Sequence, residues 1–239
     1  MVNNTTGTGT GTGSVTVSAG SFLGGIGTVQ GAVTNSGTVG PGNVVGTLHF
    51  GNTYTQAAGA RLEMDLASAA SHDELVVTGA ASLAGTLAVS LVNGFSPDEG
   101  DQFEVLRASG FGGSTFDSMS LPALSGNMVW NVNYSSTALT ISVLLPGDFD
   151  GDGTVDTNDY VVWQKNVGQP AGTLVNDNTG GTIGGAQYNL WKSNFGNTSG
   201  GGSGSSLAQT AVPEPAAMIL ALVAGAAMTL LHGRRRKAF

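Results

Sequence analysis

The sequence predicts a mainly β protein, and three observations lead to this prediction. Glycine is abundant, with 39 residues in a chain of 239, and only 10% of the residues are charged. Hydrophobic residues still make up 40% of the chain, enough to form a buried core. Between Val15 and Val143, apolar and polar residues alternate with a period of two, and Gly or Asn interrupts the alternation every few residues. This pattern is typical of many short strands joined by tight turns.

The predicted strands are distributed over residues 1–145. They lie at residues 15–17, 27–29, 32–33, 37–39, 46–50, 62–66, 75–77, 87–91, 103–106, 130–134 and 139–143. Strands this short, with Gly and Asn at the corners, favour a parallel β-helix or solenoid, in which each turn of the chain buries its apolar side chains against the next. A β-sandwich built from the longer strands after Leu62 is the alternative arrangement.

Several short phrases in this region also resemble a known class of proteins. They are Gly37-Thr-Val-Gly-Pro-Gly-Asn43, Gly46-Thr-Leu48, Tyr54-Thr-Gln56, Asp73-Glu-Leu-Val-Val-Thr-Gly79 and Leu83-Ala-Gly-Thr-Leu87. Their order resembles the C-terminal part of autotransporter-like passenger β-helices and related surface proteins. The resemblance implies a right-handed parallel β-helix that ends in a β cap and has an adhesive or structural role.

A twelve-residue loop after the last predicted strand carries most of the recognisable chemistry. Carboxylates occupy its positions 1, 3, 5, 9 and 12, and Gly153 stands at position 6, where a calcium loop makes a sharp turn. Ca²⁺ prefers oxygen ligands at these positions, together with the backbone carbonyl at position 7. The spacing therefore predicts one calcium site, and a solvated Asp/Gly turn is the alternative. The predicted ligands are Asp148, Asp150, Asp152, Thr154 through its carbonyl, Asp156 and Asp159.

The residues around this loop predict a helix after it but none before it. Pro146 and Gly147 follow a strand and break regular structure, so no helix enters the loop. Residues 160–167 are predicted to form the exiting helix, with Tyr160, Trp163 and Val167 on one face. The same Tyr/Trp pattern returns in residues 188–196, and we expect the two helices to pack as a pair.

A calcium loop without its entering helix, followed by a second Tyr/Trp helix, resembles the type I dockerin domain. The likeness is closest to the shortened form found in planctomycete-type exported proteins, and it covers residues 146–197. It implies the calcium ligands named above and makes a cohesin-like protein a candidate partner. The second half departs from the family pattern, because no ligand position of its loop is a carboxylate. We therefore expect one calcium ion, and the departure weighs against cohesin binding. The corresponding second-loop positions are Asn176, Asn178, Gly180, Thr182, Gly184 and Gln187.

The last part of the chain predicts a linker and a membrane-spanning helix. Residues 198–211 are rich in Gly and Ser, which is typical of a flexible linker. An uncharged apolar run at residues 216–231 follows, and four cations close it. This order favours a transmembrane helix with its basic end in the cytoplasm, and a buried core helix is the alternative. The four cations are Arg234, Arg235, Arg236 and Lys237.

Residues 212–239 as a whole resemble the PEP-CTERM sorting signal of Gram-negative bacteria. All three parts of that signal are present: Val212-Pro213-Glu214-Pro215, the apolar run and the basic cluster. The resemblance implies export, transient anchoring in the inner membrane, and cleavage near Val212 to Pro215 by an exosortase-type enzyme that transfers the protein to the cell envelope or the extracellular matrix. Because the first residues contain no signal peptide, we expect an additional segment upstream of Met1.

Charge and composition exclude several classes of function. Without the four terminal cations, four basic residues face sixteen acidic ones, a net charge of −12 that argues against nucleic-acid binding. The chain has no cysteine and no recognisable catalytic motif. Two acidic segments, His72-Asp73-Glu74 and Asp98-Glu99-Gly100-Asp101, are interpreted as solvated turns. We therefore expect a non-enzymatic, calcium-binding surface protein, with surface polysaccharide as another candidate partner. A calcium-dependent polysaccharide-degrading enzyme and a cohesin-docking component are the alternatives.

Overall fold

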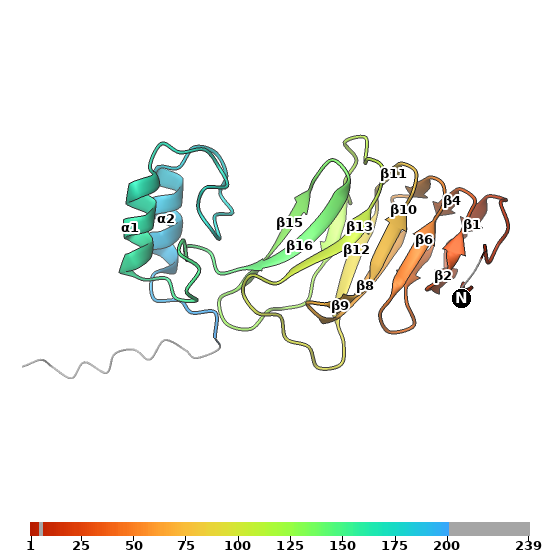
Figure 1. Ribbon diagram of the computed structural model, residues 1–239, viewed down its shortest axis with the longest axis horizontal. Helices are drawn as coiled ribbons and strands as arrows, with labels where there is room; N and C mark the ends of the chain where they lie inside the picture. The colour runs from red at the N-terminus through yellow and green to blue at the C-terminus, as the bar shows by residue number, and fades with distance from the viewer. Residues whose placement is uncertain (5–6, 201–239) are drawn as a thin grey trace, which may run out of the picture. The chain divides into compact units, whose positions relative to one another are not determined.

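The computed structural model describes residues 1–4 and 7–200, and these residues are mainly β. They lie within one compact unit, Met1–Gly201. The described residues form sixteen strands and two short helices (Figure 1). The strands are β1 (Val15–Val17), β2 (Phe22–Gly25), β3 (Thr28–Val29), β4 (Val33–Asn35), β5 (Thr38–Pro41), β6 (Thr47–Phe50), β7 (Tyr54–Gln56), β8 (Arg61–Ser68), β9 (Ser71–His72), β10 (Glu74–Val77), β11 (Ala81–Ser82), β12 (Thr86–Leu91), β13 (Gln102–Arg107), β14 (Ser118–Ser120), β15 (Val129–Tyr134) and β16 (Ala138–Leu144). The helices are α1 (Thr157–Asn166) and α2 (Gly185–Asn194).

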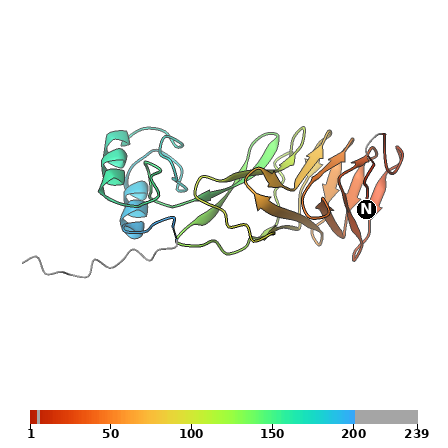
Figure 2. The same cartoon turned by 60° about the horizontal axis from the view of Figure 1, so that its bottom comes forward.

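The strands form three sheets, and most neighbouring strands in them run parallel. The sheet orders are β1-β4-β7-β11, β15-β16-β13-β10-β6-β3 and β14-β12-β8-β5-β2. Successive strands along the chain belong to the three sheets in turn (Figures 1 and 2). For example, β4, β5 and β6 each lie in a different sheet, and in these sheets β7 pairs with β4, β8 with β5 and β10 with β6. Antiparallel pairing joins β13 to β16, β15 to β16 and β8 to β9. The prediction of a mainly β fold is confirmed. After Leu62, β10 and β12 extend the existing sheets by parallel pairing, and β16 and β15 are then added by antiparallel pairing. These strands belong to the same three sheets and do not form a separate sandwich.

The core follows directly from the period-two pattern of the strands. In β8, the side chains of Leu62, Met64 and Leu66 are fully buried, while the residues between them point outward. Val39 of β5 and Leu87 of β12 stand in register with Leu62 on either side. Apolar side chains therefore stack from strand to strand, and their removal from water is the main favourable contribution to this fold.

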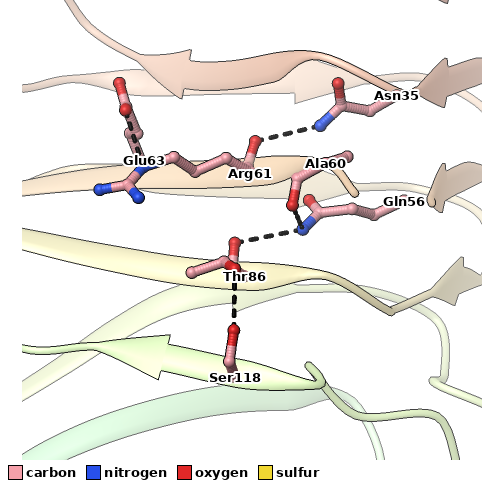
Figure 3. Close-up of polar contacts among 7 residues, drawn as sticks. All are labelled: Asn35, Gln56, Ala60, Arg61, Glu63, Thr86 and Ser118. Carbon is pink, nitrogen blue, oxygen red and sulfur yellow. Dashed lines mark hydrogen bonds and ion pairs between the residues drawn. The ribbon is translucent and has the colours of Figure 1, made fainter. Parts of the chain in front are cut away.

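Two buried amides occupy the corner where β4 and β7 end. Asn35 donates from Nδ2 to the carbonyl of Arg61 at 3.1 Å, and its Oδ1 accepts from the Gly37 N–H at 2.9 Å. Gln56 donates from Nε2 to the carbonyl of Ala84 at 2.9 Å. The same nitrogen donates to the carbonyls of Thr86 at 3.2 Å and Ala60 at 3.4 Å (Figure 3). Backbone groups that turn a corner cannot all be paired within a sheet, and these amides supply the missing partners.

The two helices begin and end close to the predicted positions. Asp156 caps α1, because its carboxylate accepts from the Asn158 N–H at 2.6 Å. The helix ends at Asn166, so the prediction that Val167 lies on its packed face is wrong: Val167 is 51% exposed. The prediction that the helices pack as a pair is confirmed by ring contacts such as that of Tyr160 with Trp191, whose centroids are 5.2 Å apart. Among residues 1–4 and 7–200, no helix is long and apolar enough to cross a membrane. The helix predicted at residues 216–231 lies outside the described residues.

Candidate metal centre

The acidic loop begins at a tight turn directly after β16, where glycine supplies a positive φ. The Asp148 N–H bonds to the Leu145 carbonyl at 3.2 Å, and Gly147 between them has φ +97°. A side chain at Gly147 would also meet the backbone of Trp191, since a Cβ there would lie 3.1 Å from its Cα. Gly153 has φ +87°, as expected for position 6 of a calcium loop. The glycines therefore set the direction in which the loop leaves the strand and turns back.

Asp148 is the centre of this loop. Its carboxylate is fully buried. Oδ1 accepts from the Gly151 N–H at 2.7 Å and from the Asp152 N–H at 3.3 Å, while Oδ2 accepts from the Gly153 N–H at 2.8 Å. The chain is thereby wrapped around one carboxylate, and the following carboxylates are brought back towards it.

Three of the predicted ligands converge. Oxygen atoms of Asp148, Asp150 and Asp152 lie within 4.8 Å of one another, and the last two side chains are exposed. Asp152 also accepts from the Thr154 N–H at 2.9 Å, which orients its carboxylate. A donor set made only of hard carboxylate oxygens fits Ca²⁺ or Mg²⁺ and does not fit a metal that prefers nitrogen or sulfur.

The remaining predicted ligands join the loop to α1. Asp156 caps the helix, and Asp159 is fully buried in its first turn. Asp159 accepts from the N–H groups of Phe149 at 2.6 Å and Asp156 at 2.7 Å. Oδ1 accepts the Phe149 bond and a further bond from the Asp150 N–H at 3.2 Å, whereas Oδ2 accepts only the Asp156 bond. Oδ2 therefore keeps a lone pair with which Asp159 can bind a cation. Thr154 lies in the segment that pairs with the residues after α2, through a bridge to Thr198.

Burial and repulsion by neighbouring carboxylates disfavour the charged forms of Asp148 and Asp159. Burial raises the pKa of Asp148 to about 6. Bonds from the backbone N–H groups of Gly153 and Gly151 lower this pKa, and the nearby Glu99 raises it further. Burial, with a smaller contribution from the Asp148 charge, raises the pKa of Asp159 to about 6. A divalent cation would reverse both effects, because it stabilises the ionised carboxylates.

The second half of the helical part repeats the first, with amides in place of the key carboxylates. Val155 exchanges backbone bonds with Gly196 and Asn197 after α2, and Ile183 exchanges the same bonds with Gly168 and Gln169 after α1. The indole N–H groups are also equivalent, since Trp163 donates to the Gly184 carbonyl at 2.9 Å and Trp191 donates to the Asp156 carbonyl at 2.7 Å. The two loops are thus related by an internal repeat.

Gln187 stands in the second loop where Asp159 stands in the first. Its Oε1 accepts from the Gly184 N–H at 2.8 Å. Its Nε2 donates to the Gly180 carbonyl at 3.0 Å and to the Asp177 carboxylate at 3.1 Å. The amide nitrogen therefore binds loop oxygens that a cation could otherwise bind. The expectation of a single ion stays a prediction.

One residue beside the loop was missed by the sequence analysis. Glu99, in the turn before β13, accepts through Oε1 from the Asn176 side-chain amide. Its Oε2 is buried and has no hydrogen-bond partner. The prediction that residues 98–101 form a turn is confirmed, since the Asp101 N–H bonds to the Asp98 carbonyl at 3.2 Å, but the turn is not solvated at Glu99 Oε2. No local spacing rule could have indicated that Glu99 meets the acidic loop.

A second acidic group lies on the outside of β8. Glu63, Asp65 and Asp73 line a pocket of about 300 Å³ together with Asn43 and Ser90. Asp73 is only 2% exposed, so the interpretation of residues 72–74 as a solvated turn is wrong. Its two oxygens accept from the N–H groups of Gly46 at 2.8 Å and Asp65 at 2.9 Å. Asp73 thus ties β8 to the chain before β6.

Comparison with known proteins adds no family to these observations. The sequence matches no protein-family model, and no curated protein matches it. The predicted sorting-signal residues, Val212 to Pro215 and Arg234 to Lys237, lie outside the described residues.

Proposed function

We propose that this chain is a non-catalytic, exported surface protein in which a β-solenoid is joined to a calcium-binding, dockerin-like module. The observation that carries the proposal is the convergence of the Asp148, Asp150 and Asp152 oxygens within 4.8 Å, in a loop with EF-hand spacing. Asp156, Asp159 and the carbonyl of Thr154 complete the proposed ligand set. The cyclic order in which the strands visit the three sheets supports the solenoid.

The proposed role of calcium is to hold the helical pair together. The folded loop gathers its ligands, whereas the unfolded chain does not, so calcium stabilises the folded state. At a free calcium concentration one hundred times the dissociation constant, this contribution is about 2.7 kcal/mol. We expect slower hydrogen exchange in residues 160–168 when calcium replaces a chelator.

Calorimetric calcium titration of the full chain tests this proposal. We expect one site in the wild-type chain, and much weaker binding in Asp150→Asn and Asp152→Asn. These two side chains are exposed, so their replacement leaves the packing intact. Glu104→Gln, which removes one charge from β13, is the matched control and should bind as the wild type does. The absence of calcium heat in the wild type would contradict the proposal.

The proposed route to the surface rests on residues 212–239. Their order of Pro-Glu-Pro, apolar run and basic cluster supports sorting by an exosortase-type enzyme and transient anchoring through residues 216–231. Co-expression with such an enzyme should shorten the chain near Val212 to Pro215, and mass spectrometry would detect the new terminus. Pro213→Ala combined with Pro215→Ala should reduce this cleavage, and an uncleaved wild-type chain would contradict the assignment.

The pocket beside β8 is the observation that favours a rival, a calcium-dependent enzyme acting on polysaccharide. Glu63 and Asp65 line it as potential acid–base groups. However, Glu63 is paired with Arg61 at 2.9 Å, and both oxygens of Asp73 are bonded to the backbone. Release of reducing sugars or unsaturated products by the wild type, lost in Asp65→Asn, would favour the enzyme over the structural role.

A further inference from the structure

Glu99 is held beside the acidic loop by the backbone of the last strand. The Gly100 N–H donates to the Val143 carbonyl at 3.0 Å, and the Val143 N–H donates to the Asp101 carbonyl at 2.9 Å. Within the turn, the Asp98 N–H bonds to the Asp101 carboxylate at 3.0 Å. Since Val143 lies just before the loop, this turn fixes Glu99 next to the first loop residues.

The Glu99 carboxylate points at the loop. Its Oε1 and the backbone carbonyl of Asp148 both accept from the same Asn176 amide nitrogen, the latter at 3.0 Å. Its Oε2 lies against the sixth loop position, because a Cβ built on Gly153 would be 3.9 Å away.

In the part of the chain that the structure describes, the Glu99 carboxylate has no ion-pair partner, and the Asn176 amide donates only to its Oε1. Oε2 has less than 1 Å² of accessible surface and no hydrogen-bond partner. The two ion pairs among residues 1–4 and 7–200 belong to other carboxylates, Glu63 and Glu104. A buried anionic oxygen without a donor is strongly unfavourable unless a cation binds it or a proton neutralises it.

We propose that Glu99 is an additional ligand of the calcium ion, contributed by the β part of the molecule to the loop of the helical part. This inference rests on the proposed calcium site and extends it. The ion would then bind the turn at residues 98–101 and the loop at residues 148–159 at once. Calcium would regulate the connection between the sheet and the helical pair as well as the order of the loop.

The test is calcium titration of the full chain carrying Glu99→Gln, with Asp98→Asn as the matched control. Both variants remove one negative charge from the same turn, but the Asp98 side chain is exposed. We expect Glu99→Gln to weaken calcium binding by about tenfold or more, because affinity follows the number of charged ligands. Asp98→Asn should stay within about twofold of the wild type, since exposed charges are screened. Glu99→Asp, which keeps the charge but shortens the side chain, should also weaken binding.

A second readout separates ligation from a purely structural role. Without calcium, Glu99→Gln should be at least as resistant to urea as the wild type, because it removes an uncompensated charge. With calcium, the wild type should become the more resistant of the two, and the Gly100 amide should exchange more slowly. If wild-type calcium binding is retained in Glu99→Gln, the inference is overturned and the calcium site stands. Equal weakening in Asp98→Asn would also overturn it, as a general charge effect. If the wild type binds no calcium, both the role of Glu99 as a ligand and the proposed calcium-binding function are refuted.

Discussion

Replacing Gln56 with leucine should destabilise the fold strongly, although the two side chains are similar in size. Gln56 is 2% exposed and lies at the corner after β7. Its amide nitrogen donates to the carbonyl of Thr86, as Figure 3 shows. The same nitrogen donates to the carbonyl of Ala84, and the side-chain oxygen accepts from the Tyr54 hydroxyl at 2.5 Å. Leucine can make none of these bonds, so the buried Tyr54 hydroxyl would lose its acceptor and the two carbonyls would lose their side-chain donor.

The expected loss follows from these three bonds. A typical hydrogen bond contributes about 1 kcal/mol net, and a buried group left without a partner costs about 1–3 kcal/mol. The gain from burying a more apolar side chain offsets part of this. We therefore expect Gln56→Leu to lower the free energy of unfolding by about 3 kcal/mol, a large fraction of the 5–15 kcal/mol typical of folded proteins.

Urea unfolding followed by far-ultraviolet circular dichroism would measure this loss. Gln102→Leu is the matched control, because Gln102 is exposed at the start of β13, and its replacement should change stability by no more than about 0.5 kcal/mol. A double-mutant cycle with Tyr54→Phe should give a coupling energy of about 1 kcal/mol. If Gln56→Leu were no more destabilising than Gln102→Leu, the view that the corner amide stabilises the turn between sheets would be refuted.

Three further predictions concern single positions. Burial raises the pKa of Asp73 to about 7. The folded state then retains a proton that the unfolded chain loses above about pH 4, so stability should fall as the pH rises from about 4 to about 7, by an amount on the order of a few kcal/mol. Asp73→Asn should flatten this part of a urea-unfolding pH profile, and an unchanged profile would contradict the assignment. Gly147→Ala should cost about 1–3 kcal/mol, because φ is +97° and Trp191 is close, and calorimetry should find a lower unfolding temperature. Trp191→Phe loses the indole bond to the Asp156 carbonyl. The free energy of opening of α1, measured by hydrogen exchange, should therefore fall by about 1 kcal/mol. An unchanged value would argue against this contact.

Much of the fold could be predicted because its determinants are local. The alternation of Leu62, Met64 and Leu66 specifies both the strand and its buried face, whatever the neighbouring strand contributes. The acidic loop is local in the same sense, since the spacing of Asp148, Asp150 and Asp152 alone brings their oxygens together once Gly153 turns the chain.

What the sequence could not predict depends on contacts between distant residues. Asp73 is flanked by polar residues and would be solvated in isolation, but Gly46 and Asp65 bury it by bonding to both of its oxygens. Glu99 meets Asn176, which lies 77 residues further along the chain. Val167 has the spacing of a helix residue, but the backbone pairing of Gly168 with Ile183 ends α1 before it. Each case requires knowledge of which segments become neighbours.

The backbone pairing between Val155 and residues 196–197 has a consequence for the order in which the chain can fold. Val155 donates to the Asn197 carbonyl at 2.9 Å and accepts from the Gly196 N–H at 2.8 Å. The acidic loop is therefore closed by residues that a ribosome or an export channel delivers much later than the loop itself. Parallel strands can pair with the preceding strands as they emerge, whereas the proposed ion site cannot close before the residues after α2 are present. In vectorial synthesis or secretion, closure of this loop would mark the completion of the folded part.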